Sequence, residues 1–354
     1  MRWHRFSAVA GVLLVTAASL SACGTGAGTA DLPPTVSGLA KEARSEGVVN
    51  WASWNPEAQM RPAIDLFEKT YPGIKVKYTN VKAPDQISRL KVEQAARKVS
   101  IDVANAGGLT VSPAVKMAAD VDWAKYGVGA KDVFAKNFVY VWATPKVWAY
   151  NTGKVKAADV PTSWDDLLDG KWGDGKVSAE SRASFMTVWD LNDAMGEAKA
   201  LDWAKKFAPL KPHYSPNLTA AAAPIESGQV DLGTSLINLV LAAKAKGVPV
   251  EIAPVSPTSA NESYLYVPKG APHPAAAALL TAFLSSDEAQ SVLAKTYNSR
   301  IPASTDCSAP DGNAVVTALC AAHVEWYGAT SLKDYDNLAG FFPKVEKALG
   351  TDVG

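Results

Sequence analysis

Short apolar segments alternate along this chain with segments whose apolar residues recur at helical spacing. Residues 48–52 form an apolar run of strand length, and the Asn-Pro-Glu sequence at 55–57 is typical of a helix start. The following apolar residues, spaced at i, i+4, i+7 and i+11, share one helical face: Met60, Ile64, Phe67 and Tyr71. Residues 74–78 then alternate as a strand. Alternation of this kind predicts an α/β architecture with mainly parallel sheets.

The same alternation continues to the end of the chain. Strands are predicted at 101–104, 138–151, 176–178, 230–234 and 264–268, with helices at about 85–98, 162–167, 201–207, 219–227 and 235–247 and a further helix from 274. A capping box at Ser285 and Glu288 predicts the start of another helix. Because domains contain about 100–200 residues, the 354-residue chain is expected to form two of them. The apolar run 138–151, interrupted by Pro145, is expected to supply strands that pass between the two.

Charge and metal-ligand content exclude several classes of protein. The chain has 35 basic and 35 acidic side chains, whereas nucleic-acid binders usually have a basic excess or a basic face. Four His and three Cys leave little material for a zinc cluster. We therefore expect no metal, no cofactor and no nucleic-acid partner.

The N-terminus has the features of a targeting segment. Arg2 and Arg5 precede a short apolar stretch at 6–18, which is shorter than the roughly 20 residues of a membrane-spanning helix. The sequence Leu-Ser-Ala-Cys at 20–23 resembles the lipobox of bacterial lipoproteins, in which the cysteine is lipidated. We therefore predict a signal peptide at 1–22, and a lipidated Cys23 with a flexible, glycine-rich tether at 23–45. A plain secretory signal is the alternative.

The two remaining cysteines agree with a location outside the cytoplasm. Cys307 and Cys320 flank a turn-rich loop, and in an oxidising compartment such a pair is most simply a disulfide. The alternative, a metal or redox pair, lacks neighbouring His or Cys residues.

Several segments, taken in order, resemble the extracellular solute-binding proteins of bacterial ABC importers, in the subgroup of iron(III), phosphonate and polyamine binders. The resemblance spans about 45–305, with segments at 46–57, 63–76, 150–152, 161–172, 225–233, 267–274 and 300–302. It implies a two-lobed α/β fold of the type II periplasmic-binding-protein kind with the ligand cleft between the lobes. Residues 46–142 plus 263–302 would form lobe 1, and 143–262 plus 303–354 lobe 2, with the C-terminal helices on the surface of one lobe.

The family's geometry implies that four loops and a neighbouring tyrosine line the cleft. The expected ligand-binding residues are Ser53, Trp54, Asn55, Gly107, Gly108, Arg182, Ser184, Thr234, Ser235, Asn238 and Tyr264. Helix N-termini and Arg182 favour an anionic group on the solute, whereas aromatic faces favour a ring or an organic cation. A zwitterion would satisfy both preferences. The alternatives are a helix cap at Asn55 or Ser235, an ordinary turn at 107–108, and a surface pair of Arg182 with Glu180.

Aromatic residues favour an organic solute over a metal ion. Five tryptophans occur in segments expected near the cleft or hinge, Trp51, Trp54, Trp142, Trp148 and Trp189, and each is either ligand-stacking or core. Iron-binding members carry a tyrosine pair after the strand equivalent to 230–233, but this chain has no tyrosine between Tyr214 and Tyr264.

The resemblance implies a lipid-anchored monomer on the extracytoplasmic face of the cell membrane that delivers a small organic solute to an ABC permease and catalyses nothing. Delivery to a sensor is an option. Fe(III) binding and an enzyme with an acidic-pair site are the alternatives.

Overall fold

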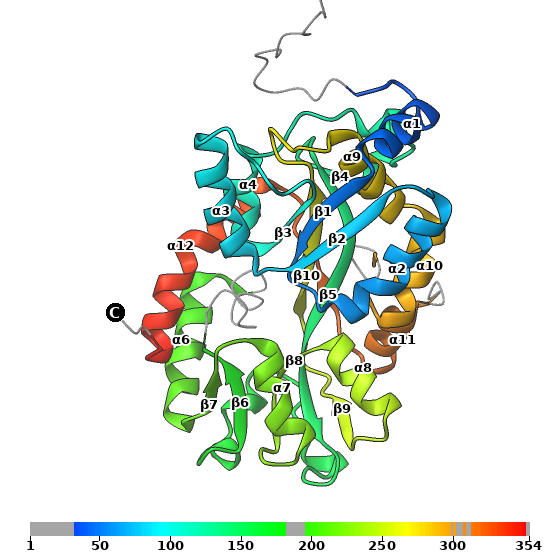
Figure 1. Ribbon diagram of the computed structural model, residues 1–354. Coiled ribbons are helices and arrows are strands. Elements are labelled where there is room, and N and C mark those ends of the chain that lie inside the picture. The colour runs from blue at the N-terminus through cyan, green and yellow to red at the C-terminus, as the bar shows by residue number, and fades with distance from the viewer. Residues whose placement is uncertain (1–31, 182–194, 299, 302–306, 309–312, 352–354) are drawn as a thin grey trace, which may run out of the picture.

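The computed structural model describes residues 32–181, 195–298, 300–301, 307–308 and 313–351. The ribbon shows two α/β lobes, one above the other, joined by long central strands (Figure 1). The predicted signal peptide, Cys23, Arg182, Ser184 and Trp189 lie outside the described residues, as does the tether up to residue 31.

The upper lobe begins with the predicted alternation of helix and strand. Its elements are α1 (Val36–Glu46), β1 (Val48–Ser53), α2 (Glu57–Thr70), β2 (Lys75–Asn80), α3 (Ala83–Ala95), β3 (Ala104–Ala106), α4 (Val111–Val115), β4 (Val133–Phe134), α9 (Pro274–Leu284) and α10 (Asp287–Leu293). Gly47, with φ +72°, ends α1 and turns the chain directly into β1. β1 and β2 pair in parallel over six residues, and Trp51 bridges to Val103, which extends the layer towards β3.

Two long antiparallel strands connect the lobes. β5 (Phe138–Asn151) pairs with β10 (Thr258–Tyr266) as far as Pro145, and from Lys146 onward it pairs with β8 (Leu232–Leu236). The expected break at Pro145 is absent, because a residue without an N–H fits where the strand changes partners. β5 and β10 are therefore the crossing strands that join the two lobes (Figure 1).

The lower lobe has a second layer that mixes parallel and antiparallel pairs, so the expectation of mainly parallel sheets is wrong. It contains β6 (Val177–Glu180), α6 (Glu197–Phe207), β7 (His213–Ser215), α7 (Leu218–Glu226), α8 (Ile237–Ala245) and β9 (Val250–Ile252). β6 pairs in parallel with both β7 and β8. The helix predicted at 162–167 is wrong: only a 3₁₀ turn at Asp166–Leu168 forms, because the Asp166 carboxylate accepts the Thr162 and Ser163 N–H groups and closes a tight loop.

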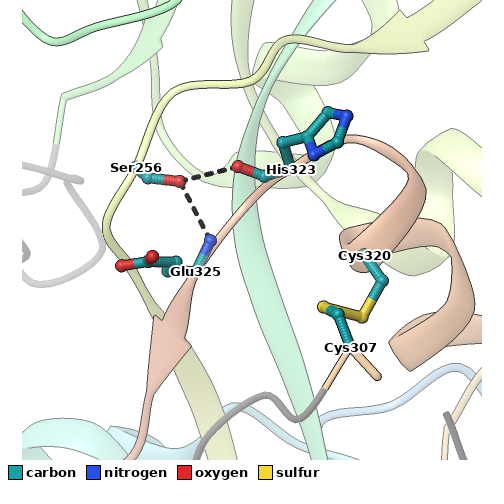
Figure 2. Close-up of a disulfide and its surroundings, with 5 residues drawn as sticks. All are labelled: Ser256, Cys307, Cys320, His323 and Glu325. Atoms are coloured by element: carbon teal, nitrogen blue, oxygen red, sulfur yellow. Dashed lines mark hydrogen bonds between the residues drawn. A yellow bond between two sulfur atoms is a disulfide. The ribbon is translucent and has the colours of Figure 1, made fainter. Parts of the chain in front are cut away.

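The C-terminal segment returns to the crossing strands. It forms α11 (Ala314–Ala321), β11 (Trp326–Tyr327) and α12 (Leu332–Leu349). Cys307 and Cys320 form the expected disulfide, with Cα atoms 5.4 Å apart. Beyond it, Ser256 Oγ donates to the His323 carbonyl and accepts from the Glu325 N–H, which ties this segment to the chain before β10 (Figure 2).

Helix α12 lies against both lobes, not on the surface of one. It packs on α6 of the lower lobe, and on α4 and the 3₁₀ turn Gly108–Thr110 of the upper lobe. Six of its side chains are buried, Tyr335, Leu338, Phe341, Phe342, Val345 and Leu349, in a cluster that includes residues of both lobes. None of the helices in the described part of the chain is long and apolar enough to cross a membrane.

Removing the disulfide is expected to destabilise the protein. The bond closes a loop between positions 13 residues apart. Replacing both Cys307 and Cys320 by Ser should lower the free energy of unfolding by about 3 kcal/mol, since the unfolded chain loses a constraint. Urea denaturation measures the change, and the wild type under reducing conditions is the control. Equal stability of the oxidised wild type and the double variant would contradict this expectation.

Candidate functional site

The loop after β1 is held rigidly at the lower edge of the upper lobe. The Asn55 carbonyl accepts hydrogen bonds from the Tyr78 hydroxyl and from Asn80 Nδ2, both at 2.6 Å. The Asn55 side chain is buried and its Nδ2 donates to Asn298 Oδ1 at 3.3 Å, while its Oδ1 has no partner among the described residues. Asn55 is not the helix cap that the sequence suggested: α2 begins at Glu57, with Pro56 at the N-cap position.

Trp54 and Gly107 bring two of the predicted loops together. A Cβ on Gly107 would lie 3.1 Å from Cη2 of the Trp54 ring and 2.4 Å from the carbonyl oxygen of Glu262 on β10. Its backbone is extended, with φ −171°, so a side chain is excluded here by contact and not by backbone conformation. The first predicted loop, the second predicted loop and a crossing strand thus meet at one point.

The lower lobe supplies a second group of polar residues at the ends of neighbouring strands. Glu180 is the last residue of β6, and Thr234 lies in β8; both are fully buried. The Glu180 N–H donates to Thr234 Oγ1 at 3.2 Å. Asn238 in the first turn of α8 is 7% exposed, and its Oδ1 has no hydrogen-bond partner in the described structure. Ser235 is not an N-cap: it is buried inside β8, and α8 begins at Ile237 after Leu236.

Most of the tryptophans named from the sequence are core residues. Trp51 and Trp142 lie in the core of the upper lobe with their ring centroids 6.5 Å apart, and Trp148 packs against Trp164 and Phe207 in the lower lobe. Trp54 is only partly buried. Among these four tryptophans, it is the one that is not fully buried.

Tyr264 lies in β10, within a cluster of aromatic side chains formed by Phe134, Tyr140 and Tyr335. It is 3% exposed, and its hydroxyl lies 3.2 Å from that of Tyr335. Its backbone is paired with Ala106, the residue before Gly107, in the antiparallel ladder of β3 and β10, while its side chain lies in the aromatic cluster.

Glu262, a buried carboxylate on the crossing strand β10, was not predicted from the sequence. Its Oε2 accepts from the Tyr335 hydroxyl at 2.5 Å, and its Oε1 accepts from the Ala329 N–H at 2.6 Å. Burial raises the pKa of Glu262 to about 7, although these two hydrogen bonds and the nearby Lys146 act to lower it. β10 begins six residues before the strand predicted at 264–268, so the predicted bounds left Glu262 outside it.

Glu262 should make stability depend on pH in a defined direction. Because its pKa is raised from 4.5 to about 7, the folded protein binds a proton there that the unfolded chain releases. Stability should therefore rise as pH falls through that interval, and the contribution should be lost above pH 7. Comparing wild type with Glu262→Gln by thermal unfolding between about pH 5 and pH 8 isolates the effect. A difference in melting temperature that stays constant with pH would show that Glu262 does not titrate there.

No group of three or more His, Cys, Asp and Glu side chains with metal-binding geometry occurs in the portion of the chain that is described. The candidate site is instead built from amide and hydroxyl groups, one tryptophan ring and glycine backbone.

A family model for bacterial extracellular solute-binding proteins matches residues 63–319. The chain belongs to this family. The binding protein therefore acts outside the cytoplasm, and its relatives are transport proteins and not enzymes. No curated protein sequence matches it.

Solved structures show that the binding protein has the type II two-lobed fold of ABC-transporter substrate-binding proteins. The substrate-binding protein of an ABC transporter from Agrobacterium tumefaciens aligns with a TM-score of 0.71 at 18% identity, over 87% of this chain and 96% of that one. Iron-bound HitA from Pseudomonas aeruginosa aligns with a TM-score of 0.66 at 17% identity, over 85% of this chain and 99% of HitA. AgtB from A. tumefaciens, in complex with agropinic acid, aligns with a TM-score of 0.63 at 18% identity, over 86% of this chain and 99% of AgtB.

Proposed function

We propose that this protein is the lipid-anchored solute-binding component of an ABC importer, which captures a small organic solute by closing its two lobes. The observation that carries the proposal is the position of the polar loops beside the crossing strands. Ser53, Trp54 and Asn55 end the first strand of the upper lobe, and Thr234 and Asn238 follow the equivalent edge of the lower one. In open α/β sheets, ligands bind outside the carboxyl ends of the strands.

The lobe boundaries proposed from the sequence are supported by the strand pairing. β5 exchanges β10 for β8 between Pro145 and Lys146, close to the proposed boundary at 142–143. Gly107 and Gly108 join the upper half of the proposed site. Ser235 belongs to the lower half, Tyr264 supports the site from the crossing strand, and Arg182 and Ser184 are proposed from the sequence alone.

The solute that best suits these groups is a zwitterion. Buried amide oxygens of Asn55 and Asn238 can accept hydrogen bonds from an ammonium group, and the Trp54 ring can contact a cation or a ring. Arg182 would pair with a carboxylate. The protein would act as a monomer, held at the extracytoplasmic face of the cell membrane through Cys23, and would pass the solute to a permease.

A thermal-shift screen of the purified protein tests the proposal. The panel contains amino acids, sugars, polyamines, phosphonates, vitamins, opine-type conjugates and Fe(III). A solute at 100 times its dissociation constant should add about 2.7 kcal/mol to the free energy of unfolding, which raises the melting temperature by several degrees. Trp54→Ala should abolish the shift, whereas Val92→Ala, at an exposed position on α3, should leave it unchanged.

Two results would overturn the proposal. A shift with Fe(III) and with no organic solute would identify an iron-binding protein, in agreement with iron-bound relatives of the same fold such as HitA. Turnover of a panel compound instead of reversible binding would identify an enzyme.

Loss of transport in a permease deletion would distinguish delivery to a permease from presentation to a sensor.

A further inference from the structure

Helix α12 is fixed to the crossing strand at its beginning and to both lobes along its length. β11 pairs in parallel with the first residues of β10, Thr258 and Ser259. From there the chain enters α12, which contacts α4 in the upper lobe and α6 in the lower one (Figure 1). Near its C-terminal end, Lys344 Nζ lies 2.6 Å from Glu197 Oε1 of α6. Rotation of the lobes about β5 and β10 therefore requires α12 to move relative to at least one of them.

Glu262 is the polar anchor between this helix and the hinge. It lies opposite Ala143 of β5, and its carboxylate spans the gap to the C-terminal segment through the Ala329 N–H and the Tyr335 hydroxyl. Gly328 permits this approach, since a Cβ there would lie 2.3 Å from Glu262 Oε1. A carboxylate that accepts two hydrogen bonds in a buried setting holds its partners more strongly than neutral groups do.

Space beside the anchor allows the helix to shift. A cavity of about 250 Å³ separates the crossing strands from the start of α12, lined by residues that include Gly108, Lys146, Asn261, Thr330 and Leu338. Protein interiors are otherwise close-packed and resist sliding of one element over another. Here the polar anchor restrains the helix at a place where packing leaves it room to move.

We propose that Glu262 is a positioning residue for solute capture, which holds α12 as a strap across the hinge and so sets the balance between open and closed lobes. This inference rests on the proposed capture of a solute by lobe closure. Closure of a hinge around a ligand is an established way of coupling binding to a change of shape. A group that stabilises one lobe arrangement by a given free energy can change the apparent free energy of solute binding by up to that amount.

Protonation of the carboxyl should tighten the strap, because burial favours the neutral form and an opened, hydrated arrangement would release the proton. The titratable or charged side chains that face Glu262 come from three elements: Lys146 and Tyr140 of β5, Tyr264 of β10, and Asp334 and Tyr335 of α12. Residues 328–330, which also pack against it, bring no titratable side chain. A protonated carboxyl keeps both contacts, because its O–H can donate to the Tyr335 hydroxyl while its other oxygen accepts from the Ala329 N–H. The pKa of about 7 puts this change near neutral pH.

Hydrogen exchange and small-angle scattering of the solute-free protein test the strap. Tyr335→Phe removes only the hydroxyl, and Glu262→Ala removes the carboxyl and with it both contacts. In both variants the exchange of α12 amides, corrected for intrinsic rates, should rise at least about tenfold, a ratio that corresponds to about 1.4 kcal/mol, and the radius of gyration should increase. Tyr126→Phe is the matched control, because that hydroxyl donates to the Pro33 carbonyl at 2.8 Å within the upper lobe.

The pH profile separates positioning from a general loss of stability. In the wild type, α12 exchange corrected for intrinsic rates should fall between about pH 8 and pH 5, and Glu262→Ala should show the same fast exchange at both. Wild-type exchange and radius of gyration in both variants, or an equal rise in Tyr126→Phe, would overturn the strap. Because no solute is used, these outcomes do not depend on the solute screen: a failed screen would count against the proposed function, and an unaltered α12 against the strap.

Discussion

Trp51→Ala is expected to lower the free energy of unfolding by about 3–5 kcal/mol, the range found when large aromatic core residues are truncated. Trp51 is fully buried in β1, with its ring edge-on to Tyr78 at 5.0 Å and 6.5 Å from the ring of Trp142. Its Nε1 donates to Asn105 Oδ1 at 3.0 Å, and Asn105 Nδ2 donates to Ser263 Oγ on β10. Truncation would leave both a cavity and an unpaired buried oxygen where β1, β3 and β10 meet.

Urea denaturation with circular dichroism measures this loss. Trp51→Phe should recover part of the stability, since it fills much of the cavity but cannot donate the hydrogen bond. Val92→Ala, at a position that is 69% exposed, should change stability by less than about 0.5 kcal/mol. If Trp51→Ala were as stable as Val92→Ala, the upper lobe would not depend on this cluster.

Gly107→Ala is expected to weaken solute binding at least about tenfold, equivalent to about 1.4 kcal/mol. The added methyl group would overlap the Glu262 carbonyl oxygen, at 2.4 Å, and crowd the Trp54 ring, at 3.1 Å. Since the carbonyl belongs to the crossing strand, the loop and Trp54 must move away from the position that the proposed site requires. The same overlap should reduce stability by about 1–3 kcal/mol.

Isothermal titration with the solute found by the screen measures the effect on affinity. Gly170→Ala is the matched control, because a Cβ there meets nothing within 4 Å and the residue is exposed. Its affinity should equal that of the wild type. Unchanged affinity in Gly107→Ala, with the fold intact by circular dichroism, would place the solute away from Trp54 and Gly107.

Periodicity in the sequence was sufficient for the layout of the fold but not for its local ends. The alternation of apolar runs and helical faces correctly predicted β1, α2, β2 and α3, because burial of one face dictates that spacing. Helix caps were less predictable. Asn55 and Ser235 are good capping residues, and yet Pro56 and Leu236 hold those positions, and α10 is capped by Ser286 and not Ser285. Tertiary contacts of the loops, such as Tyr78 with the Asn55 carbonyl, fix these ends.

The candidate site was also only partly predictable from the sequence. Ser53, Asn55, Thr234 and Asn238 could be named from the sequence because the resemblance to solute-binding proteins implied that their segments line the cleft. The meeting of Trp54 with Gly107 and Glu262 could not be selected, because it joins residues that are more than 50 and 150 positions apart.

The sequence by itself determined the α/β class, the disulfide of Cys307 with Cys320, and the solute-binding family, since these depend on local spacing, composition and ordered motifs. Only the tertiary structure decided that β5 passes unbroken from one lobe to the other and that α12 lies across both. It also decided that Glu262 is buried against Tyr335, 73 residues further along the chain. The physical reason is that burial and hydrogen bonding of a charged group depend on which distant segments fold over it, and no local pattern encodes that choice.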